Sequence, residues 1–174
     1  MTFRSMTTGA SGFAGLLLAA LLLLPAAPAE AQRAEAAVKL FDNMSGTWSG
    51  TGLVTLAGGE KERIRCRVTY EVSETGNRVE QDLRCASDSY KFELMCDITY
   101  ANGYITGRWN ARTQRQSGTI SGRAAAGLIE ALAETSGFSA FFTMVTRGDQ
   151  QSVKITSESQ LISDVTITLR RTGR

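Results

Sequence analysis

Hydrophobic and polar residues alternate along most of the chain after residue 46, which is the period-two pattern of half-buried β-strands. The alternation is clearest on both sides of a turn of sequence ETGN at residues 74–77. Cys66 and Cys85 lie at mirror positions about this turn, each on the apolar side of its run. Because successive side chains of a strand point to opposite faces, only one hairpin register places both cysteines on the apolar face and opposite each other. The pattern therefore predicts an antiparallel hairpin in which these two side chains meet.

A second hairpin is predicted at Asn102 and Gly103, the preferred dipeptide of a two-residue type I′ turn. Its register places Cys96 opposite Trp109. Further alternating runs, separated by turns that often contain glycine, continue to the C-terminus, a pattern typical of a sandwich or barrel rather than of βαβ units. The expected strands cover about residues 47–56, 62–73, 78–86, 89–100, 104–112, 117–123, 128–134, 138–146, 151–157 and 163–171.

The segment 124–134, of sequence AAAGLIEALAE, does not fit this alternation. It is rich in helix formers, so propensity alone favours a helix. Gly127 opposes a helix, because glycine in its middle costs about 1 kcal/mol relative to alanine, and it suits a hairpin turn. We expect a turn followed by a strand, with a helix as the alternative.

The N-terminus has the pattern of a secretory signal, with Arg4 in a short polar start and an apolar stretch over residues 13–24. Small residues around Ala31 provide a cleavage site. The expected organisation is a signal peptide over 1–31, a lead with a short helix over 32–45, and a single β-barrel domain over 46–174.

Two observations argue against a membrane span. The apolar stretch of about a dozen residues is shorter than the roughly 20 that a spanning helix needs. The outward strand positions carry the charged residues Arg65, Asp82 and Arg84, and a barrel facing lipid would bury the basic ones at about 2–4 kcal/mol each. We therefore expect the protein in the periplasm or the extracellular medium.

Export to an oxidising compartment favours a disulfide among the three cysteines. The predicted bridge joins Cys66 to Cys85 and leaves Cys96 free. A bridge between Cys85 and Cys96 is the alternative.

The chain contains no histidine, and its formal net charge is only +2. The lack of histidine removes the commonest general base, the usual Ser-His-Asp triad and the commonest transition-metal ligand. A net charge this small is not that of a nucleic-acid-binding surface. We therefore expect no enzymatic activity, no metal or cofactor, and no nucleic-acid partner.

Gly46-Thr47-Trp48 opens the first expected strand, and Arg171 has the inward parity of the last one. In a closed up-and-down barrel these strands are neighbours, so Arg171, or Arg170 as the alternative, is expected across the Trp48 ring. The pattern resembles the calycin superfamily, the lipocalins and avidin-like proteins. This resemblance implies an antiparallel up-and-down barrel, of about eight to ten strands here, with a ligand site at its open end.

Three tyrosines and one tryptophan share the expected inward parity: Tyr70, Tyr90, Tyr100 and Trp109. A few polar groups in an apolar cavity are what orient a ligand, so we predict a non-enzymatic barrel that binds a small apolar molecule through these four side chains. Alternatively, the tyrosines lie near the barrel mouths with their hydroxyls in water.

The other function considered is an envelope protein-binding module or a secreted protease inhibitor on the same barrel. Phe141 and Val145 lie on the outward side of a run whose inward side is also apolar. These two residues would either pack against the segment 124–134 or form a surface for a protein partner.

Overall fold

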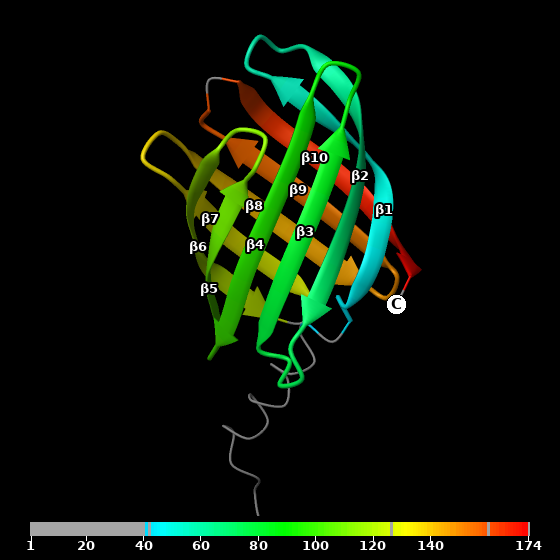
Figure 1. Ribbon diagram of the computed structural model, residues 1–174, viewed down its shortest axis with the longest axis vertical. Coiled ribbons are helices and arrows are strands. Elements are labelled where there is room, and N and C mark those ends of the chain that lie inside the picture. Colours follow the sequence, from blue (N-terminus) through cyan, green and yellow to red (C-terminus); the bar gives the residue numbers. More distant parts are fainter. Residues whose placement is uncertain (1–40, 42, 126, 160, 174) are drawn as a thin grey trace, which may run out of the picture.

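The chain forms a closed barrel of ten antiparallel β-strands (Figure 1). The computed structural model describes residues 41, 43–125, 127–159 and 161–173. The strands are β1 (Gly46–Leu56), β2 (Lys61–Val72), β3 (Arg78–Ala86), β4 (Lys91–Ala101), β5 (Tyr104–Ala111), β6 (Gln116–Ala125), β7 (Leu128–Glu134), β8 (Ser139–Arg147), β9 (Gln150–Ser157) and β10 (Ile162–Gly173). Each strand pairs with its neighbours in sequence, and β1 closes the barrel against β10. The predicted all-β, antiparallel up-and-down barrel is confirmed.

The predicted signal peptide over residues 1–31 and the predicted short helix of the lead lie outside the described residues, of which Phe41 is the first. Within the described ranges, no helix is both long and apolar enough to cross a membrane.

The first hairpin, β2–β3, has the predicted register. Cys66 pairs with Cys85, their Cα atoms lie 4.1 Å apart, and the two sulfur atoms form a disulfide. Cys96 is free and buried on β4, so the alternative pairing with Cys85 is excluded. The predicted bridge is therefore confirmed, and it joins neighbouring strands on the inner face of the barrel.

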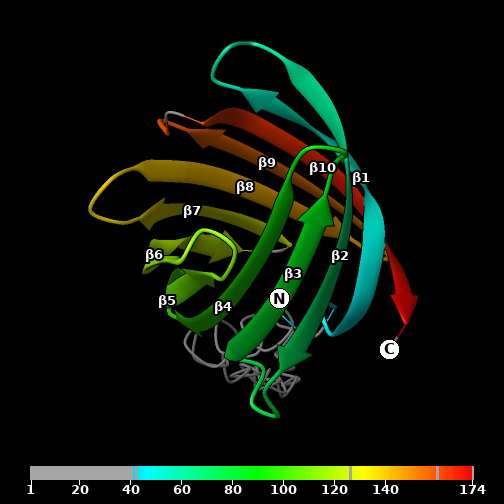
Figure 2. The ribbon, with the colours of Figure 1, turned by 45° about the horizontal axis from the view of Figure 1, so that its top comes forward.

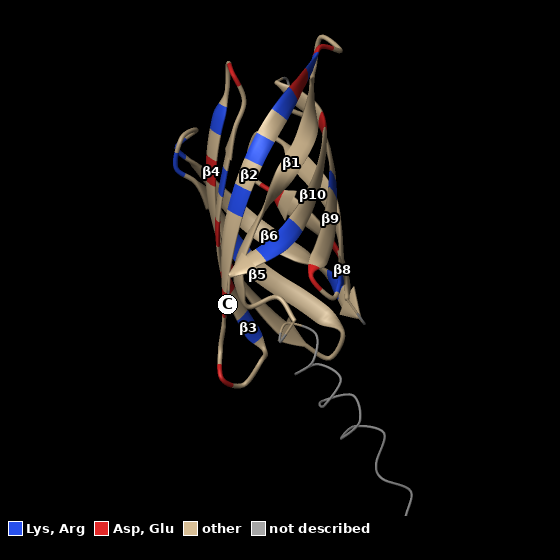
Figure 3. Cartoon of the chain, turned by 90° about the vertical axis from the view of Figure 1, so that its right-hand side faces the viewer, with Lys and Arg blue, Asp and Glu red and all other residues tan. Residues whose placement is uncertain are grey.

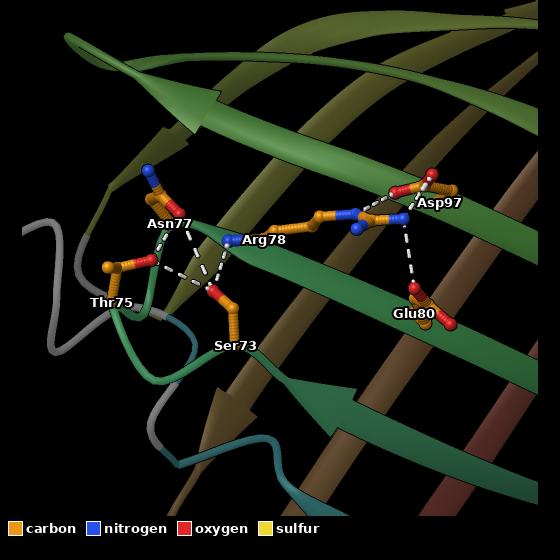
Figure 4. Close-up of polar contacts among 6 residues, drawn as sticks. All are labelled: Ser73, Thr75, Asn77, Arg78, Glu80 and Asp97. Carbon is orange, nitrogen blue, oxygen red and sulfur yellow. Dashed lines mark hydrogen bonds and ion pairs between the residues drawn. The ribbon is translucent and has the colours of Figure 1, made fainter.

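Hydrogen bonds within the turn hold the β2–β3 hairpin (Figure 4). The backbone N–H of Arg78 donates to Ser73 Oγ at 3.2 Å, and Thr75 Oγ1 donates to Asn77 Oδ1 at 2.7 Å. Beside the turn, the Arg78 guanidinium donates two hydrogen bonds to the Asp97 carboxylate, at 2.7 and 2.8 Å. These bonds hold the pKa of Asp97 below its usual value and join the outer faces of β3 and β4.

The segment 124–134 forms the end of β6, a turn and strand β7, as expected. Gly127 has a φ of +81°, a conformation that glycine adopts without steric cost. The buried residues Ile129 and Ala131 alternate with the exposed residues Leu128 and Glu130. Backbone pairing with β6 and β8 on both sides outweighs the helix propensity of this segment.

One end of the barrel is closed around Trp48, at the start of β1. The Trp48 side chain is fully buried, and its Nε1 donates to the backbone carbonyl of Met44 at 2.8 Å. The guanidinium carbon of Arg171 lies 4.3 Å from the centroid of the Trp48 ring, which confirms the predicted cation–π contact. Arg171 also donates to Asp149 at 2.8 Å and to the backbone carbonyls of Asn43 and Ser45, so it joins β10, the β8–β9 turn and the lead.

A buried polar network lies at the same end. The Tyr70 hydroxyl donates to Gln151 Oε1 at 2.8 Å, and Gln151 Nε2 donates to Thr146 Oγ1 at 3.1 Å. Gln151 is fully buried, and burial raises the pKa of Tyr70 well above its usual value. Phe41 is also fully buried and packs edge-on against Tyr100, with ring centroids 6.1 Å apart. We call this region, with Trp48 at its centre, the closed end.

Candidate ligand-binding site

The exposure of inward side chains differs between the two ends of the barrel. At the closed end, Trp48, Tyr70 and Leu169 are at most 4% exposed. Toward the opposite end, many inward apolar side chains are only half-buried: Leu56, Leu83, Cys85, Phe92, Leu94, Phe138, Phe142, Val153, Ile155 and Val165. We call that end, which Figure 2 turns toward the viewer, the open end.

The half-buried side chains lie on two opposite walls. Leu83 and Leu94 are cross-strand partners on β3 and β4. Ile155 of β9 pairs with Phe142 of β8 and with Val165 of β10. In the strand order, β3–β4 lies across the barrel from β8–β9. Because the sheet shields inward side chains from solvent outside the barrel, their residual exposure indicates that solvent reaches both walls through the open end.

Polar groups gather at the rim of the open end. The Glu62 carboxylate accepts hydrogen bonds from Ser87 Oγ at 2.6 Å and from Ser89 Oγ. These serine hydroxyls lower the pKa of Glu62. Nearby in sequence, the Tyr90 hydroxyl accepts from Gln114 Nε2 at 2.8 Å, which joins the β3–β4 and β5–β6 loops. The rim is therefore polar, whereas the walls below it are apolar.

The structure does not gather the four predicted ligand-binding side chains into one cluster. Tyr70 and Tyr100 belong to the closed end, whereas Tyr90 lies at the rim of the open end. Tyr90 and Tyr100 are separated by about 33 Å along the chain, at 3.3 Å per strand residue. Trp109 packs between them, against Phe138, with ring centroids 5.8 Å apart. The role of these residues in binding stays a prediction. Their side chains lie in different parts of the barrel.

The Cys96 thiol and the Tyr70 hydroxyl, both on the inner face, remain protonated at neutral pH. Burial raises the pKa of the Cys96 thiol to about 12, and burial also raises that of Tyr70. The Trp109 Nε1 atom is buried and has no hydrogen-bond acceptor among the described residues.

Sequence reasoning left out Gln151 and several wall residues, such as Leu83 and Phe138. Gln151 shares its strand parity with the inward residues Val153 and Ile155, and this parity is the sequence signal that indicates an inward position for Gln151. Its partner Tyr70 lies 81 residues away in sequence, so no local pattern could connect the two.

On the outer wall, Phe141 is 48% exposed and pairs with Leu132 of β7. Val145 is half-buried and pairs with Leu128, which is 38% exposed. Phe141 therefore lies beside the segment 124–134 in the same sheet and keeps about half of its surface in solvent. A protein partner at this surface stays a prediction.

Comparison with known proteins adds evidence on the fold. No protein family matches the chain, and no curated protein matches it. Among solved structures, the S-type phycobiliprotein lyase CPES from Guillardia theta is similar, with a TM-score of 0.57 and 10% sequence identity. The match covers 82% of this chain and 97% of that one. At this identity the likeness shows the fold alone, a closed antiparallel barrel, which is the fold that the resemblance at Gly46, Trp48 and Arg171 implies.

Proposed function

We propose that the protein binds one small, largely apolar molecule in the open end of its barrel. The supporting observation is the pair of opposite apolar walls, on β3–β4 and β8–β10, whose inward side chains are only half-buried. A ligand between these walls would remove their apolar surface from water, which is favourable by roughly 25 cal/mol per Å². Tyr70 and Tyr100 would lie beneath the site, Trp109 beside it and Tyr90 at its rim.

The proposed function involves no chemistry on the ligand. General acid–base catalysis works best with a group whose pKa lies near the working pH. Among the described strands, Glu62 is the one carboxylate with inward parity, and its pKa is lowered. The pKa values of the buried Tyr70 and Cys96 are raised instead. These groups are therefore suited to holding a fixed protonation state rather than to transferring protons.

The proposal also places the protein in the periplasm or outside the cell. The expected signal peptide would direct it there, and the Cys66–Cys85 bridge persists in an oxidising compartment.

The test is a titration of residues 32–174, which contain all ten strands, with a fluorescent fatty acid and with a retinoid. Native mass spectrometry of the same mixtures gives the stoichiometry. We expect one molecule per chain for at least one probe. Failure of both probes to bind, together with a protein purified from cells without any co-purifying small molecule, would contradict the proposal.

A matched pair of variants locates the site. Leu94→Trp adds bulk to the inner face of β4, whereas Met95→Trp adds the same bulk one residue later on the outer face. We expect the first variant to weaken probe binding at least tenfold and the second to leave it unchanged. Equal affinities for both variants would show that the probe binds elsewhere.

A second candidate function is supported by the outer surface of β7 and β8. Leu128 with Val145 and Leu132 with Phe141 form two apolar cross-strand pairs there, on either side of the pair Glu130–Thr143, and Phe141 is half exposed. Such a surface suits a protein partner. In a pull-down from envelope extract, a partner of this surface would be retained by the wild type and lost with Phe141→Ser. Identical retention by both would count against this candidate.

A further inference from the structure

The outer face of β2 carries a row of basic side chains. Lys61, Arg63, Arg65 and Arg67 occupy alternate positions, and all four are exposed. Alternate residues of a strand point to the same side and lie about 6.6 Å apart, so these groups form one continuous strip. Figure 3 shows the strip as a series of blue segments along β2. It starts at the open end of the barrel, where β2 begins.

The basic side chains of the strip form no ion pair with a carboxylate of the described residues. On the adjacent wall, Arg78 pairs with Asp97 at 2.7 Å and with Glu80 at 2.9 Å. In contrast, no carboxylate of the described residues lies within ion-pair distance of the four strip residues. The outward side chains of the neighbouring strand β1 are also uncharged: Thr47, Ser49, Thr51, Leu53 and Thr55.

The strip borders a hollow of the outer wall. Lys61, Arg63 and Arg65 line it together with Thr51 of β1 and with hydroxyl-bearing residues of β10, Thr166 and Thr168. Guanidinium, ammonium and hydroxyl donors in one hollow match the acceptor oxygens of a phosphate group. Glu62 and Asp88 also line the hollow, so it carries three basic side chains against two carboxylates.

Exposed apolar side chains accompany the strip. Leu53 is 44% exposed, lies in the same hollow and pairs with Arg63. Leu161, in the β9–β10 loop at the open end, is 68% exposed. Basic groups combined with exposed leucines are the features of a surface that binds a lipid bilayer, where the charges meet anionic headgroups and the apolar groups enter the interface.

We infer that the strip Lys61–Arg67 docks the barrel on a membrane surface that contains anionic phospholipids. Leu53 distinguishes this partner from a nucleic acid, since a phosphate backbone gains nothing from an exposed leucine among arginines. Because the strip begins at the open end, docking would bring the mouth of the barrel close to the bilayer. The inference does not depend on the barrel containing a ligand.

The test measures co-sedimentation of residues 32–174 with vesicles of phosphatidylcholine alone and with vesicles that contain 30% phosphatidylglycerol. Removing residues 1–31 excludes binding through the apolar stretch at 13–24. We expect binding to the anionic vesicles only, and binding that weakens at high salt because the strip is exposed.

Two double variants with the same change of net charge distinguish binding through the strip from nonspecific electrostatic attraction to the vesicles. Arg63→Glu with Arg65→Glu reverses the strip, whereas Arg123→Glu with Arg147→Glu reverses exposed charges on β6 and β8. Each basic group near an anionic surface contributes about fivefold in affinity, so the first pair should weaken binding more than about twentyfold. The second pair should change it by less than about threefold, since its charges lie on another wall.

Circular dichroism and the melting temperature verify that both double variants fold. Leu53→Ser, which keeps all charges, should weaken binding a few-fold. Equal loss in the two double variants would overturn the inference, as would binding to heparin without any binding to anionic vesicles.

Discussion

The two ends of the barrel are built from the same alternation of residues, yet they differ in how completely their interiors are filled. At the closed end, Trp48 and Leu169 are at most 1% exposed. At the open end, Leu94 and Ile155 have the same inward parity and are only half-buried. Strand parity therefore determines which side chains face inward, but it does not determine whether the interior is full.

The closed end is filled in part by residues of the lead, which precede the first strand. Phe41 and Met44 of the lead are buried against the barrel, and the Arg171 guanidinium covers the Trp48 ring. At the open end, the polar rim around Glu62 is instead hydrogen-bonded to loop serines. Under the proposed function, the closed end chiefly provides stability and the open end binds the ligand. The variants below test this division, starting with the largest expected effect.

Trp48→Ala should destabilise the barrel by about 3–5 kcal/mol, because it removes a fully buried ring and leaves a cavity beneath Arg171. Chemical denaturation measures the free energy of unfolding. Trp48→Phe serves as a control that keeps an aromatic ring and should cost less. A loss below about 1 kcal/mol for the alanine variant would show that Trp48 does not anchor the closed end.

The same substitution at the two ends compares them directly. Leu169→Ala should cost about 2–5 kcal/mol, since Leu169 is 1% exposed in a filled region. Leu94→Ala should cost about half as much, because the side chain keeps part of its surface in solvent. Both free energies come from the same denaturation experiment. Equal losses would mean that the open end is packed as completely as the closed one.

Tyr70→Phe should destabilise by about 1–3 kcal/mol, because it leaves the buried Gln151 Oε1 without its hydrogen-bond donor. Tyr104→Phe removes a hydroxyl from a side chain that is 56% exposed and should have almost no effect. If the two variants unfold at the same denaturant concentration, the buried network does not stabilise the closed end.

Alkaline pH tests the burial of Cys96, which lies between the two ends. The thiol has a pKa of about 12 in the folded protein, raised by burial from an ordinary value of 9.0. Between these values the unfolded chain loses the proton and the folded chain keeps it, so stability falls as pH rises from 9. The wild type should therefore lose up to about 1.4 kcal/mol per pH unit more than Cys96→Ala. Parallel pH profiles would show that solvent reaches this thiol.

Much of the fold follows from local sequence signals. The mirror positions of Cys66 and Cys85 give the first register, and Asn102-Gly103 gives the second, because a tight turn and a buried face together allow one pairing. The Trp48–Arg171 contact also follows, since closure of an up-and-down barrel makes the first and last strands neighbours.

The site follows from sequence only in part. Inward parity identifies Tyr70, Tyr90 and Tyr100 as inner side chains. How deeply each one is buried depends on the groups that fill its end of the barrel, and those groups come from distant parts of the chain. Phe41 covers Tyr100 from the lead, and Gln151 meets Tyr70 from across the barrel. These contacts are nonlocal, so no pattern of neighbouring residues predicts them.

Methyl NMR during titration with a bound probe tests the division between the two ends most directly. With labelled leucine, isoleucine and valine methyl groups, the proposed site predicts shifts at Leu94, Ile155 and Val165, which line the open end. The methyl groups of Val68 and Leu169, buried at the closed end, should stay unchanged. Shifts concentrated at Val68 and Leu169, or spread evenly over both ends, would contradict the account.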